Sequence, residues 1–215
     1  MIGNGSPFHA ICLNQPDLSK KYQQDGFKEF LLCLSCERQR SRYEDHARRS
    51  LFKNIRNIQF EGKHAILTGL EYKPLKLYSM FQIWMMGVAN HPFYSHVDLG
   101  PHADRLADLL RNEDPAEPWR YGSTLAVLGG GSGAHAGIFS QPEQTRMLSH
   151  HVYRFVVAGL HSYHFVSGHV PERGYQFLFL QEDGTWPIFR SRISDYPYLV
   201  QKLHQTANLS SATGC

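Results

Sequence analysis

A change in the spacing of apolar residues near Pro115 and Pro118 limits this chain to a mixed fold. Before these prolines, apolar side chains recur every three to four residues, which predicts helices; after them, the side chains alternate, which predicts strands. The predicted helices cover residues 35–54, 74–90, about 100–111 and about 196–206, and the predicted strands cover 123–128, 153–160, 175–180 and 186–190. We therefore expect an α+β protein with a helical middle, an antiparallel sheet and a C-terminal helix.

The first predicted helix has two different faces. Tyr43, Ala47 and Leu51 recur every four residues, and this spacing predicts an inner stripe that packs on the rest of the protein. Arginines occupy other positions of the same helix and are expected to point outward: Arg38, Arg42, Arg48 and Arg49.

Positive charge is concentrated in this helix. Between Glu37 and Arg56, seven arginines and lysines stand against three acids, a local charge of +4, whereas the whole chain carries +3. The rest of the chain is therefore about neutral. The forked donors of arginine match phosphate oxygens, so the helix favours a nucleic-acid backbone as its partner. A basic face that is merely solvated is the alternative.

Four cysteines, Cys12, Cys33, Cys36 and Cys215, are too few and too unevenly placed for a disulfide scaffold. The spacing of Cys33 and Cys36 is that of half a zinc knuckle, because two thiolates three positions apart can reach one ion. His9 and Cys12 repeat this spacing and could complete a site with three cysteines and one histidine. Two alternatives stay open, namely thiols that bind nothing and a redox pair.

The histidines show no spacing typical of a catalytic metal site. If residues 153–165 are extended, His161 and His164 face opposite sides of the sheet, because side chains three apart in a strand do so. This placement argues against a shared ion.

No apolar run is long enough to cross a bilayer, and the first residues lack the basic and apolar regions of a secretory signal. We expect a cytoplasmic protein without a membrane partner.

The segment QDGFKEFLLCLSCERQRSRYE, Gln24 to Glu44, resembles the second half of the zinc module in a bacterial and phage family of HNH-endonuclease-like proteins with paired CxxC motifs. The later segments YKPLKLYSMFQIW, HPFYSHVDLGPHADRL and NEDPAEPWRYG are similar to the region C-terminal to that module in the family, so the resemblance covers residues 24–128. It implies a ββα-metal fold that is braced by zinc. It also implies a histidine that activates water beside a divalent ion such as magnesium, to hydrolyse a phosphodiester of DNA.

The chain departs from the family pattern in one respect. The Ser-His-x-Ile-Pro segment that carries the general-base histidine is absent, so the resemblance assigns no catalytic residue and predicts an incomplete or degenerate module. It makes Cys33 and Cys36 metal ligands and leaves Cys12 and His9 as their candidate partners.

We accordingly expect an incomplete zinc-knuckle and basic-helix module at residues 1–56 and an α+β domain of unknown role at residues 57–215. The expected function is DNA binding, with metal-dependent hydrolysis if the site is intact. The alternative is a non-catalytic zinc and nucleic-acid-binding or interaction protein.

Overall fold

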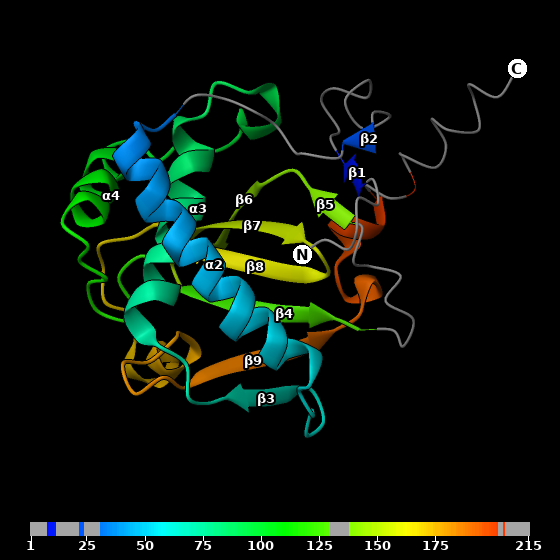
Figure 1. The fold of residues 1–215 in the computed structure, drawn as a ribbon. Coiled ribbons are helices and arrows are strands. Elements are labelled where there is room, and N and C mark those ends of the chain that lie inside the picture. The colour runs from blue at the N-terminus through cyan, green and yellow to red at the C-terminus, as the bar shows by residue number, and fades with distance from the viewer. Residues whose placement is uncertain (1–7, 12–21, 24–30, 130–137, 202–203, 205–215) are drawn as a thin grey trace, which may run out of the picture.

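The computed structural model describes residues 8–11, 22–23, 31–129, 138–201 and 204 (Figure 1). Its strands are β1 (Phe8–Ile11), β2 (Tyr22–Gln23), β3 (His64–Leu67), β4 (Ser123–Leu128), β5 (Ile138–Ser140), β6 (Glu143–Met147), β7 (His150–Val157), β8 (Leu160–Phe165) and β9 (Trp186–Ser191). Its helices are α2 (Leu34–Arg56), α3 (Tyr72–Val88) and α4 (His102–Arg111), with 3-10 turns η2 (Pro92–Tyr94), η3 (Arg173–Leu178) and η4 (Ile193–Asp195). Residues 197–201 and 204 are helical too.

The nine strands form one mixed sheet in the order β2-β1-β5-β7-β8-β4-β9-β3, with β6 paired to β7. Most neighbours are antiparallel, but β1 runs parallel to β5, and β4 runs parallel to β9. The α+β class and the C-terminal helix are thus confirmed, while the sheet is mixed rather than purely antiparallel.

Helices α2 and α3 cover one face of the sheet, with α2 crossing in front of the strands in Figure 1. Ala47 and Leu51 of α2 belong to the same apolar cluster as Leu125 of β4 and Ile188 of β9, and each is almost fully buried. The predicted boundary at residue 56 coincides with the last residue of α2, whose inner face is part of this core.

Buried helix α3 carries one charged side chain into the interior. Lys76 is 2% exposed, and its Nζ donates hydrogen bonds to the carbonyl oxygens of Pro118 and Arg120. Burial lowers the pKa of this lysine to about 7. Tyr72 also donates to the carbonyl of Ala116, so the proline-containing turn is held against α3 at three carbonyls.

The expected strand at residues 175–180 is wrong, because this segment forms η3. Its aromatic residues alternate as in a strand, yet Tyr175 and Phe177 are 41% and 58% exposed and, of these three alternating residues, only Phe179 is buried. The alternation therefore does not mark a face of the sheet.

Other differences concern strands that were not expected from the sequence. Strand β8 was expected only as the end of the strand at residues 153–160, and β3, β5 and β6 were not expected. The sequence of β8, LHSYHF, is polar, but five of its six residues are buried. Hydrogen bonding and ring stacking, rather than apolar character, allow these residues into the core.

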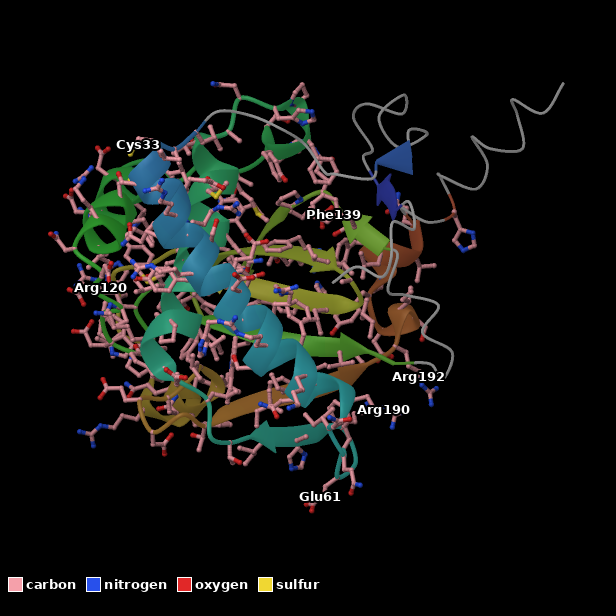
Figure 2. All side chains as sticks on the ribbon, viewed as in Figure 1. Cys33, Glu61, Arg120, Phe139, Arg190 and Arg192 are labelled. Carbon is pink, nitrogen blue, oxygen red and sulfur yellow. The ribbon has the colours of Figure 1, made fainter. Side chains whose placement is uncertain are left out.

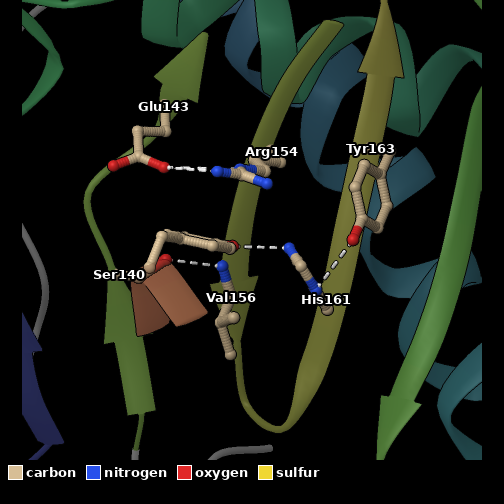
Figure 3. Close-up of polar contacts among 7 residues, drawn as sticks. Ser140, Glu143, Arg154, Val156, His161 and Tyr163 are labelled. Atoms are coloured by element: carbon tan, nitrogen blue, oxygen red, sulfur yellow. Dashed lines mark hydrogen bonds and ion pairs between the residues drawn. The ribbon is translucent and has the colours of Figure 1, made fainter. Parts of the chain in front are cut away.

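His161 and His164 lie on opposite faces of β8, as predicted. The Nδ1 atom of His164 lies 3.3 Å from Ser79 Oγ of α3, and its ring stacks on Phe155. On the other face, His161 lies between the hydroxyls of Tyr163, 3.2 Å from Nδ1, and Tyr198, 2.6 Å from Nε2 (Figure 3).

The same face joins the C-terminal segment to the sheet. The Arg154 guanidinium lies 3.6 Å from the centre of the Tyr198 ring and forms an ion pair with Glu143 at 3.0 Å. Ser140 Oγ accepts the backbone N–H of Val156 (Figure 3). Leu199 packs beside them against Leu128 and Val156, so residues 197–201 are held by both polar and apolar contacts.

Burial lowers the pKa of both His161 and His164 to about 3, so both are neutral in the folded protein at neutral pH. In the unfolded chain they bind protons near pH 6.5. We predict that stability is lost as the pH falls from about 6.5 toward 3, by up to about 1.4 kcal/mol per pH unit for each histidine. Replacing either residue, as His161→Gln or His164→Asn, should remove the uptake of one proton on unfolding. The free energy of unfolding should then change less steeply with pH than in the parent.

Urea unfolding between pH 7.5 and 4.5 measures the effect, with His64→Asn as the control because His64 is exposed. Equal pH dependence in the parent and in both core variants would show that neither buried histidine resists protonation.

Candidate nucleic-acid interface and thiol pair

The outer face of α2 carries a row of cations. Arg38, Arg42, Arg49 and Lys53 are all exposed, and at 3.6 residues per turn they lie within about 60° of one another around the helix. We call these four residues the basic stripe. It lies opposite buried Ala47 and extends for about 22 Å, at a rise of about 1.5 Å per residue. Packing of the inner face therefore directs the basic stripe to solvent.

Three other basic positions of α2 are outside the basic stripe or are less available. Arg48 is exposed, as predicted, but lies about a quarter of a turn away and pairs with Asp45 at 3.1 Å. Arg40 is 27% exposed and pairs with both Glu37 and Glu44. The side chain of Arg56 lies outside the described residues.

Within the basic stripe, only Arg42 has an acidic partner among the residues that the structure describes. It meets Glu113, which follows α4, at 3.2 Å. Both side chains are well exposed, so the pair contributes little to stability and can be exchanged for another anion. Arg38, Arg49 and Lys53 form no ion pair in this part of the chain.

Lys53 was not among the predicted nucleic-acid-binding residues. Arg49 follows Arg42 by seven residues, and Lys53 follows Arg49 by four. Residues at these spacings share one side of a helix, so projecting the charges onto a helix would have placed Lys53 on the basic stripe.

The thiol pair lies at the beginning of the same helix. Cys33 is the residue that precedes α2, and its carbonyl accepts the N–H of Glu37. Its exposed Sγ lies 3.0 Å from Ser35 Oγ, and Cys36 follows within the first turn. Hydrogen bonds from the Ser35 side chain and from the Cys36 backbone lower the pKa of the Cys33 thiol to about 7. The hydrogen bond between the two thiols raises the pKa of Cys36.

The structure brings together two of the four predicted metal ligands. Figure 2 shows Cys33 at the upper left, whereas Phe139 of β5 lies on the right of the sheet. His9 belongs to β1 and pairs with Ile138, which precedes Phe139 in β5. Cys12 lies outside the described residues, among which no group of three or more potential ligands occurs. The two thiols suit half of a tetrahedral zinc site.

No protein-family model, curated protein or solved structure matches the chain. Among the described helices, none is both long enough and apolar enough to span a membrane.

Because Cys33 is exposed and its pKa is near neutral, we predict that it reacts with iodoacetamide faster than Cys36 at pH 7, in protein treated with a chelator. Ser35→Ala removes the strongest hydrogen bond to the thiolate and should slow the alkylation of Cys33. Ser41→Ala, at an exposed position of the same helix, should leave the rate unchanged. Peptide mass spectrometry measures each site, and equal rates in the two serine variants would contradict the assignment.

Proposed function

We propose that this protein binds double-stranded DNA through the basic stripe of α2. The observation that carries the proposal is the exposure of four cations along one side of a helix whose opposite side is fixed in the core. Three of these cations have no acidic partner in the described part of the chain, so phosphate does not have to compete with a carboxylate for them.

Backbone binding is the form of recognition that this surface supports best. Lysine and arginine side chains that neutralise phosphates release counterions, and this release drives binding without regard to sequence. The helix is long enough to contact several phosphates, and arginine predominates, with its planar donors. Affinity should therefore depend strongly on salt and weakly on base sequence.

The proposal includes a zinc ion held by Cys33 and Cys36, with its remaining ligands outside the described residues. Such an ion would brace the first turn of α2 at one end of the basic stripe. The resemblance to HNH-endonuclease-like proteins further implies phosphodiester hydrolysis. Incubation of plasmid DNA with magnesium or manganese tests that activity separately from binding.

Replacing Arg38 and Lys53 with glutamine removes two stripe charges that make no ion pair in the described part of the chain, so folding should be unaffected. We predict weaker binding to a labelled duplex. The slope of the logarithm of the binding constant against the logarithm of the salt concentration should also be less steep by about 1.8, or about 0.9 for each lost phosphate contact. Fluorescence anisotropy over a series of salt concentrations measures both quantities.

The matched control is Lys63→Gln with Arg173→Gln, which removes two exposed charges from other parts of the chain. The proposal fails if both double variants lose affinity equally, because net charge rather than the basic stripe would then determine binding.

Zinc content tests the metal part of the proposal. We predict about one zinc per chain in protein purified without added metal, and its loss in Cys33→Ser, because a structural site needs every thiolate. Elemental analysis beside Ser41→Ala as the control gives the stoichiometry. A metal-free parent protein would remove zinc from the account and leave the basic stripe untouched.

A further inference from the structure

An open pocket of about 420 Å³ lies beside the basic stripe, between α2 and the start of α3. Arg42 and Arg49 of the basic stripe line it, and Lys73 lines it from the first turn of α3. Arg49 and Lys73 form no ion pair among the described residues, so two cations in this pocket have no acidic partner there.

The beginning of α3 adds a second source of positive potential. Glu71 precedes this 17-residue helix, and its side chain does not cap the helix. The first backbone N–H groups of an α-helix have no partner within the helix, and the positive end of the helix dipole lies there. Lys73 lines the pocket, and its N–H is one of these donors, whereas Pro74, which also lines the pocket, has no N–H.

The Nε2 atom of His46, a residue that lines the pocket, is buried and has no hydrogen-bond partner within the described part of the chain. The Tyr43 hydroxyl is buried as well, but it lies beside the side chains of Glu113 and Gln39 and is not open to the pocket. The pocket therefore combines two cations that have no acidic partner in the described part of the chain with the start of a helix.

Three carboxylates also line the pocket, and each is accounted for. Glu113 pairs with Arg42, and Asp45 pairs with Arg48. Glu71 lies 3.8 Å from His46 Nδ1, and its side chain is 74% exposed, so it can turn to solvent. None of these acids neutralises Arg49 or Lys73.

We infer that this pocket binds a phosphate group, held by Arg49, Lys73 and the start of α3. The inference rests on the proposed function for the source of the phosphate, because the pocket shares Arg42 and Arg49 with the basic stripe. A backbone phosphodiester and a terminal phosphate of a DNA end have the required chemistry in common.

Inorganic phosphate is the first probe, titrated calorimetrically against the full chain at constant ionic strength. Lys73→Gln should weaken phosphate binding about ten-fold. Lys63→Gln is the control and should bind as the parent does. Parental affinity in Lys73→Gln, or no binding by the parent, overturns the inference.

Variants separate this inference from the proposed function. Arg38→Gln with Lys53→Gln changes the basic stripe outside the pocket, so it should weaken duplex binding and leave inorganic phosphate binding intact. If the parent binds phosphate but not duplex DNA, the proposed function fails and the pocket stands. If it binds duplex DNA but not phosphate, the pocket fails alone.

Duplexes with 5′-phosphate or 5′-hydroxyl ends identify the source. A loss of affinity in Lys73→Gln that is confined to phosphorylated ends assigns the pocket to a terminal phosphate, whereas an equal loss on both duplexes assigns it to the backbone. An unchanged affinity for both duplexes contradicts a role in DNA binding.

Discussion

Packing of the inner face of α2 determines what the rest of this surface can do. Ala47 is fully buried, and Leu51 lies in the same cluster as residues of β4 and β9. The side chain of Gln39 adds a polar anchor, because it donates to the carbonyl of Leu110 at the end of α4. A helix held in this way along its length cannot rotate, so its opposite side stays exposed. The cations on that side are therefore arranged before any partner arrives, which reduces the entropic cost of binding.

Polar burial fixes the elements that flank this helix. Lys76 holds the turn after α4 through two carbonyls, and Glu113, which pairs with Arg42, lies at the beginning of that turn. His164 reaches α3 through Ser79, while His161 contacts Tyr198 behind the sheet. These contacts connect the sheet to α3 on one face and to the C-terminal segment on the other. The pocket between α2 and α3 therefore lies on the same helix as buried Lys76.

The helices could be predicted from the sequence because their apolar residues follow a clear period. Tyr43, Ala47 and Leu51 predicted the buried side of α2, and the exposed arginines followed from it. Strand β8 could not be predicted in the same way, since its buried histidines and serine look exposed to any rule based on hydrophobicity. The reverse error occurred at Phe177, an apolar residue that the fold leaves exposed.

The candidate site was predictable only in part, for the same physical reason. Local spacing brought Cys33 and Cys36 into one turn and the arginines onto one helix. The pocket joins α2 to the first turn of α3, more than twenty residues later, and its donors become neighbours only through tertiary packing. Lys73 shows no sequence signal that distinguishes it from any exposed lysine.

Arginine modification by phenylglyoxal, with and without duplex DNA, tests the central claim most directly. Mass spectrometry of the modified peptides reports each arginine separately in the unaltered protein. Arg38 and Arg49 should be protected by DNA, whereas Arg173 and Arg192, exposed on other parts of the chain, should react as before. Protection that is equal at all four arginines, or absent from Arg38 and Arg49, would contradict binding through the basic stripe.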